Sequence, residues 1–302
     1  MEFERSCADR RVPEISPVGD RIRVVIDSDA KCEMDDQWAI TLALLADDRF
    51  AIEGFVGASF DSAEYGRSSI DASVDEINHL IGLTESDPSI PVRRGAPPLQ
   101  YPTEPSASAG VDFIIERALA GEADDPLWVI GLGAATDVAS AIMQDERIVD
   151  RIVVFQHLRT NWPEYCVNYN VYNDVRAAQR LFHSPVPFVL FDTGDHLTCP
   201  MEESAAEVAP YGEIGAYLHE YRHRRPYFSR PDKGIFDLGD IAALIDPELA
   251  TWEVEPCPSI RYDQSYDFDG PDRGRILRCG DIDRDGTFRL FYDRLQDAFP
   301  ES

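Results

Sequence analysis

Four aspartates lie close together near the N-terminus, within residues 25–36 (VIDSDAKCEMDD). Asp27 and Asp29 follow a short β-branched run that predicts a buried parallel strand. Asp35 and Asp36 precede apolar residues at helical spacing, so we expect them to open a helix, whose N-terminus favours negative charge. Because ligands of open α/β sheets bind at the carboxyl ends of strands, this segment is the main candidate site.

The grouping of these carboxylates predicts a bound divalent cation. Four carboxylates at one strand end would repel one another unless a cation neutralised them. Oxygen ligands without His or Cys favour Ca²⁺ or Mg²⁺ over Zn²⁺. The alternative, that these residues are helix caps in a generally acidic chain, explains one or two of them but not all four.

Strands and helices alternate in the pattern around this segment. Short apolar runs predict strands at residues 23–26, 50–56, 127–130, 151–155 and 187–191, and near Ile260 and Arg275. Helical spacing predicts helices at residues 37–45, 69–81, 112–120, 136–144, 175–182, 215–222, 238–245 and 288–297. The alternation predicts one Rossmann-like α/β domain over residues 21–302, with a mainly parallel central sheet flanked by helices. Residues 1–20 are expected to form a loose N-terminal extension.

The aspartate segment resembles the inosine–uridine nucleoside hydrolase family, in which a strand ends in Asp-x-Asp and Asp-Asp opens the next helix. Here the loop between the two pairs is two residues longer and lacks the family's Pro-Gly. Two departures lie further on: Asn168 stands at a family Glu, and Phe236 at a family His. Four later segments resemble family motifs in family order: residues 90–99 (IPVRRGAPPL), 129–137 (VIGLGAATD), 168–178 (NYNVYNDVRAA) and 236–247 (FDLGDIAALIDP).

The resemblance implies the nucleoside hydrolase type of α/β fold and a Ca²⁺-dependent reaction. That reaction is hydrolysis of the N-glycosidic bond of a ribonucleoside, which gives free base and ribose. Asp29 would accept a proton from the attacking water as general base. The implied Ca²⁺ ligands are Asp29, Asp36, Asp237 and the backbone carbonyl of Thr136.

The resemblance also implies how the sugar is held. Asp35 and Asn170 would bind sugar hydroxyls, while Asn161 and Asn168 would lie near the 5′ end. Asp27 would brace the aspartate loop from behind the ion's ligands.

The proton donor for the leaving base is left open, because Phe236 replaces the family His. His157, His196 and His223 are candidates, and His196 follows the strand at residues 187–191, at the favourable end of the sheet.

Two other functions also stay open. The first is a nucleoside- or sugar-binding homologue without catalysis. The second is a phosphatase of the haloacid dehalogenase type, because Asp27-Ser-Asp29 follows a strand; against it, Lys31 stands where that class has Thr or Val.

The charge of the chain narrows its partners. The formal net charge is −28, which repels nucleic acid and anionic membranes, so a small-molecule nucleoside is the expected partner. No apolar run approaches the about 20 residues of a membrane span, and the polar residues 1–20 lack a signal-peptide core, so a cytoplasmic location is expected. The six cysteines form no CxxC pair, which favours free thiols. The family resemblance suggests a homodimer or homotetramer.

The charged residues are also unusual in kind. Lys31 and Lys233 are the only lysines in the sequence, and the other basic residues are arginine. An acidic, lysine-poor surface is typical of proteins from salt-loving organisms, because salt screens the self-repulsion. The alternative, a GC-rich genome that favours arginine over lysine, explains the arginine bias but not the excess of acidic residues.

We therefore predict that salt stabilises the folded chain. The midpoint of thermal unfolding should rise steeply from dilute buffer to molar KCl, because screening weakens the repulsion among the 56 acidic residues. Sucrose of equal osmolality is the control for effects unrelated to charge. A midpoint independent of KCl would contradict a halophilic adaptation.

Overall fold

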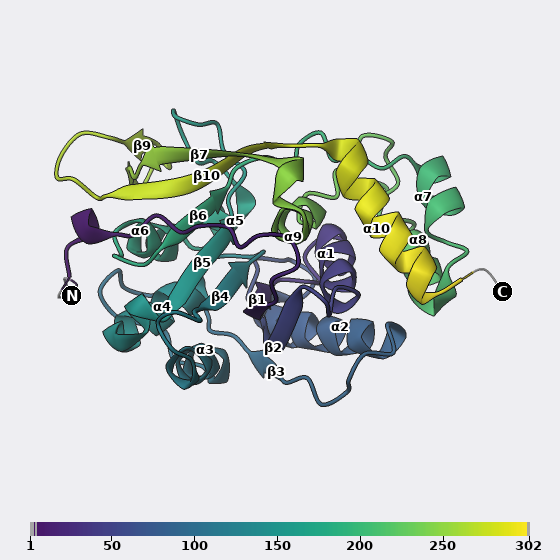
Figure 1. Cartoon of the computed structure of the whole chain (residues 1–302), viewed down its shortest axis with the longest axis horizontal. Coiled ribbons are helices and arrows are strands. Elements are labelled where there is room, and N and C mark those ends of the chain that lie inside the picture. The colour runs from purple at the N-terminus through teal and green to yellow at the C-terminus, as the bar shows by residue number, and fades with distance from the viewer. Residues whose placement is uncertain (1–2, 4, 301–302) are drawn as a thin grey trace.

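The computed structural model describes residues 3 and 5–300, and one eight-stranded sheet forms its centre (Figure 1). Neighbouring strands are parallel except the last pair, which is antiparallel. This confirms the predicted α/β fold with a mainly parallel sheet. The strands in spatial order are β3 (Val92–Arg94), β2 (Phe50–Gly57), β1 (Ile22–Ser28), β4 (Leu127–Gly131), β5 (Ile152–His157), β6 (Phe188–Phe191), β10 (Arg275–Ile282) and β7 (Ala250–Pro256).

Helices cover both faces of the sheet, which explains why its central strands are continuous apolar runs. In β1, Val24 and Ile26 belong to the core on one face, while Val25 belongs to the core on the other. The first core packs against α1 (Asp35–Leu44), α2 (Ser69–Leu83), α8 (Gly212–Tyr221), α9 (Leu238–Ile245) and α10 (Arg284–Ala298). The second packs against α3 (Ala109–Ala120), α4 (Thr136–Gln144) and α6 (Val175–Phe182). None of the described helices is long and apolar enough to cross a membrane.

The short elements were missed by the sequence patterns. They are α5 (Tyr169–Asn173), α7 (Met201–Glu207), β3, β7 and β9 (Tyr266–Asp267). Strand β9 pairs with β8 (Ser259–Ile260) in a separate two-stranded sheet. Strand β7 was not predicted because it is an edge strand whose side chains are half-buried or exposed, so its sequence contains no apolar run.

Part of the N-terminal segment, within the residues that the structure describes, is attached to the α/β domain. The buried Arg10 donates hydrogen bonds to the carbonyls of Phe182 (2.8 Å) and Ser184 (3.2 Å), at the end of α6. In Figure 1 the segment runs in purple from the α6 end of the molecule towards β1.

The segment is held again next to β2, where Arg49 is 3 % exposed. Its guanidinium donates to the carbonyls of Leu244 (2.7 Å), Pro17 (2.9 Å) and Ser16 (2.9 Å). One side chain therefore ties the N-terminal segment to the end of α9.

We predict that Arg49→Ala lowers the free energy of unfolding by about 2–4 kcal/mol, because buried carbonyls lose their donors. Urea denaturation measures the change. The control is Arg147→Ala: Arg147 is 75 % exposed in an ion pair with Asp145, so its loss should cost less than about 1 kcal/mol. Equal effects of the two substitutions would refute the anchoring role of Arg49.

Candidate active site

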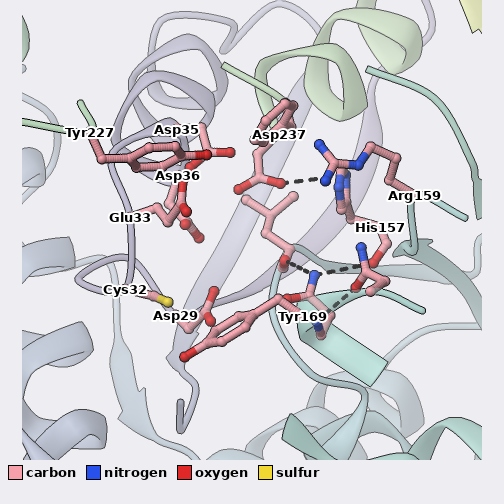
Figure 2. A pocket seen from close by; sticks show the side chains of 14 residues that line it. Asp29, Cys32, Glu33, Asp35, Asp36, His157, Arg159, Tyr169, Tyr227 and Asp237 are labelled. Atoms are coloured by element: carbon pink, nitrogen blue, oxygen red, sulfur yellow. Dashed lines mark hydrogen bonds and ion pairs between the residues drawn. The ribbon is translucent and has the colours of Figure 1, made fainter. Parts of the chain in front are cut away.

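A pocket opens at the carboxyl ends of β1, β4 and β5 (Figure 2). Asp29 follows β1 directly, Leu132 follows β4, and His157 ends β5. The first turn of α1 supplies Asp35 and Asp36, Glu33 lies in the loop before it, and Asp237 is the N-cap residue of α9. The pocket is lined by Asp29, Cys32, Glu33, Asp35, Asp36, Leu132, His157, Arg159, Asn168, Tyr169, Asn170, Tyr227, Phe236 and Asp237.

Buried carboxylates converge in this pocket from distant parts of the chain. Asp35, Asp36 and Asp237 each offer an oxygen, and these oxygens all lie within 4.8 Å of one another. Asp29 is 4 % exposed and lies close enough to feel the charges of Asp36 and Asp35. The predicted convergence of residues 29, 35, 36 and 237 is therefore present in the fold.

The mutual repulsion of these buried carboxylates favours binding of a cation. Burial and the neighbouring carboxylates raise the pKa values of Asp29 and Asp237 well above the usual range. Burial together with the charge of Asp35 raises the pKa of Asp36 to about 7, although the Ser28 hydroxyl donates to it. A cluster of carboxylate oxygens without a neutralising positive charge fits a hard divalent cation. The cluster of Asp35, Asp36 and Asp237 could hold such an ion.

His157 is the histidine that lines the pocket. Its Nδ1 lies 2.7 Å from Asp240 Oδ2 and 3.4 Å from Asp237 Oδ1. Burial opposes the charged ring, but the Asp240 carboxylate outweighs it and raises the pKa of His157. The ring is thereby oriented, and Asp240, which the sequence analysis missed, positions it.

The segment at α5 supplies two amides to the pocket. Asn170 donates to the carbonyls of Leu132 (2.6 Å) and His157 (3.2 Å), which ties α5 to the ends of β4 and β5. Asn168 precedes α5 and accepts a hydrogen bond from the Asn170 backbone N–H (2.7 Å). Both predicted substrate-binding residues therefore line the pocket.

Thr136 does not lie in the pocket, in contrast to the expectation for its carbonyl. It is the first residue of α4, and its hydroxyl donates to Asp174 (2.9 Å). From the turn after β4 it is Leu132, four residues earlier, that lines the pocket, before the chain enters α4. The carbonyl of Leu132 accepts a hydrogen bond from Asn170 (2.6 Å).

Asn161 and His196 also lie outside the pocket. Asn161 is exposed, and its backbone pairs with Tyr165 in a turn. The ring of His196 lies with Nε2 2.6 Å from the carbonyl of Ile282. His223, the remaining donor candidate, is exposed outside the pocket as well.

Asp27 does not brace the loop through its side chain. Within the described chain, its two buried carboxylate oxygens have no hydrogen-bond partner. Burial and the charge of Asp137 raise its pKa well above the usual range. The backbone carbonyl of Asp27 accepts a hydrogen bond from the N–H of Leu132 (2.8 Å), which joins the end of β1 to the turn after β4.

A parallel α/β sheet with a buried carboxylate pocket at its carboxyl edge defines an enzyme with an acidic, cation-binding active site. A model of the inosine-uridine preferring nucleoside hydrolase family matches residues 24–277, so the chain belongs to that family of N-glycosyl hydrolases.

Solved structures of nucleoside hydrolases share this fold. A plant nucleoside hydrolase is 17 % identical with a TM-score of 0.71, over 91 % of this chain and 99 % of that one. An inosine-uridine preferring nucleoside hydrolase from Bacillus anthracis is 15 % identical with a TM-score of 0.72, over 91 % and 99 %. A purine-preferring ribonucleoside hydrolase from Gardnerella vaginalis is 16 % identical with a TM-score of 0.71, over 91 % and 98 %. No curated protein sequence matches this chain significantly.

We predict that Asp36→Asn stabilises the protein in a chelating buffer, by about 1–3 kcal/mol, because one buried negative charge of the cluster is lost. The same variant should lose most of the stabilisation that a divalent cation gives the wild-type protein. Thermal unfolding with EDTA and with Ca²⁺, Mg²⁺ or Mn²⁺ measures both effects.

The matched control is Asp232→Asn, whose carboxyl is 64 % exposed. It should unfold like the wild type under both conditions. Wild-type-like cation stabilisation in Asp36→Asn would exclude Asp36 from the ion's ligands.

Proposed function

We propose that this chain hydrolyses the N-glycosidic bond of a ribonucleoside with the help of Ca²⁺, giving free base and ribose. The observation that carries the proposal is the meeting of Asp29, Asp35, Asp36 and Asp237 in one pocket at the carboxyl edge of the sheet. Membership of the nucleoside hydrolase family supports the reaction class.

The proposed ligands of the ion are Asp29, Asp36, Asp237 and one backbone carbonyl. We assign that carbonyl to Leu132, because Leu132 lines the pocket and Thr136 does not. An oxygen-only set without a cysteine thiolate supports Ca²⁺ over Zn²⁺. When bound, the ion would polarise the attacking water and bind vicinal sugar hydroxyls.

The remaining residues act directly on the water and the sugar. Asp29 accepts the proton of the attacking water, because it is a buried carboxylate and, as a proposed ligand of the ion, would lie next to the water that the ion polarises. Asp35 and Asn170 hold the sugar hydroxyls, and Asn168 lies towards the 5′ end. The His157 ring, oriented by Asp240, forms the wall next to Asp237.

The two alternative functions predict different products. A binding homologue would bind a nucleoside without releasing sugar, and the intact set of acidic residues speaks against it. A phosphatase of the haloacid dehalogenase type is opposed by the family match over residues 24–277.

We further propose a role in nucleoside metabolism, in purine or pyrimidine salvage, for a cytoplasmic homodimer or homotetramer. The proposal of a small-molecule substrate rests on the pocket and on the net charge of −28, which opposes binding of nucleic acid.

We predict that Asp29→Asn lowers kcat for a ribonucleoside by at least about 10²-fold, because the general base and one charged ligand are lost together. A reducing-sugar assay on a nucleoside panel with Ca²⁺ measures the released ribose. Asp232→Asn, with its exposed carboxyl, is the control and should keep the wild-type rate.

If Asp29→Asn kept more than about a tenth of the wild-type kcat, Asp29 could not be a general base that accelerates the reaction by about 10²-fold. Nucleoside binding without sugar release by the wild type would establish the binding homologue, and phosphate release from nucleotides would establish the phosphatase.

A further inference from the structure

Phe236 stands where the family has a proton-donating His, and it lines the pocket beside Asp237. Its ring is held in place from behind, since a side chain at Gly234 would approach Phe236 Cε1 to 1.9 Å. The guanidinium carbon of Arg159 lies 4.3 Å from the centre of this ring, within the range of a cation–π contact. An arginine therefore lies against the residue that replaced the donor.

Arg159 reaches the pocket from the loop after β5. Figure 2 shows it on the same side of the pocket as His157 and Asp237. Its charge also acts on Glu33 and on Tyr227, both of which line the same pocket. Among the described lining residues, Arg159 is the one whose side chain is cationic at every working pH.

The charge of Arg159 is available to a ligand. Its ion pair is with Asp195 (2.9 Å), whose side chain is 78 % exposed. Exposed pairs contribute about 0–1 kcal/mol, so a ligand in the pocket can compete for the guanidinium. Lys233 is different: its ammonium also contacts the Phe236 ring (4.5 Å), but it is fully buried and held by Glu33 (2.7 Å).

We propose that Arg159 binds the departing base as an anion, so that this enzyme prefers nucleosides with acidic leaving bases. The inference rests on the proposed N-glycosidic hydrolysis. A guanidinium does not release a proton at neutral pH, so it replaces the family's proton transfer by hydrogen bonds and charge. Its planar pair of N–H donors suits a ring nitrogen anion with an adjacent oxo group.

The reaction balances without a proton donor in the protein. The bond between the sugar carbon and the base nitrogen breaks, and its electron pair stays on the nitrogen. Water adds to the sugar carbon and gives its proton to Asp29. The base anion leaves the guanidinium and takes a proton from solvent, while Asp29 returns its proton to solvent. One water is consumed, and one free sugar and one neutral base are formed.

The preferred substrates are therefore nucleosides of oxo-substituted bases, such as xanthosine, inosine and uridine. Adenosine and cytidine, whose bases depart easily only after protonation, should be poor substrates. An oxo group conjugated with the departing nitrogen spreads the negative charge of the base, which the guanidinium of Arg159 can then stabilise.

The test compares kcat for the wild type and Arg159→Gln on these five nucleosides and on 4-nitrophenyl β-ribofuranoside. The 4-nitrophenolate leaves without assistance. We expect Arg159→Gln to lose about 10²-fold on inosine and uridine, the usual effect of removing a preorganised charge donor. Its rate on the 4-nitrophenyl riboside should change less than about threefold, so the dependence of log kcat on leaving-group pKa becomes steeper.

Two further variants make the result interpretable. Arg159→Lys keeps the charge but loses the planar donor pair. It should therefore lose less activity on inosine than Arg159→Gln does, with an unchanged rate on the 4-nitrophenyl riboside. If Arg159→Gln does not fold, Arg159→Lys alone tests the assignment to the leaving base. Arg147→Gln changes an exposed arginine outside the pocket and should behave as the wild type.

An equal loss on every substrate, including the 4-nitrophenyl riboside, would overturn the assignment to the leaving base. Inosine 5′-monophosphate is added to the panel for one further outcome: a loss confined to this nucleotide would mean that Arg159 binds a phosphate, and would also overturn the assignment. If the wild type released free sugar from none of the five nucleosides, the proposed function itself would fail.

Discussion

The repulsion among buried carboxylates is the constraint on which the rest of this site depends. Asp35, Asp36 and Asp237 bring oxygens within 4.8 Å of one another, and Asp29 adds a fourth negative group to the same pocket. Burial and the mutual repulsion of these carboxylates raise their pKa values. A bound divalent cation would offset this repulsion.

The topology of the sheet makes this arrangement possible. Strands β1, β4 and β5 are neighbours, so Asp29, Leu132 and His157 meet at one edge although they are far apart in the chain. Asp240 then holds His157, and Asn170 joins the ends of β4 and β5. Arg159 and Phe236 line the same pocket as these carboxylates, so the cation site and the leaving-group site that we propose would be adjacent parts of one pocket.

The sequence predicted the elements that have strong periodicity and the carboxylates that follow them. Helices α4, α6 and α9 begin and end at the predicted residues, because buried apolar spacing determines them. The position of Leu132 in the pocket lining was not predictable from residue types, since every residue has a carbonyl and the turn geometry decides which residue lines the pocket. Arg159 and Asp240 were missed for a related reason. In an acidic chain with many arginines, a single charged residue can be assigned a role only when its neighbours in the folded structure are known.

Calorimetric titration of the chelator-treated protein with Ca²⁺ tests the central claim most directly. Run in two buffers of different ionisation enthalpy, it reports both the stoichiometry and the protons released. The account predicts one Ca²⁺ per chain with proton release at neutral pH, because carboxyls with raised pKa values must lose their protons to bind the ion. No binding, or binding that persists unchanged in Asp237→Asn, would contradict it.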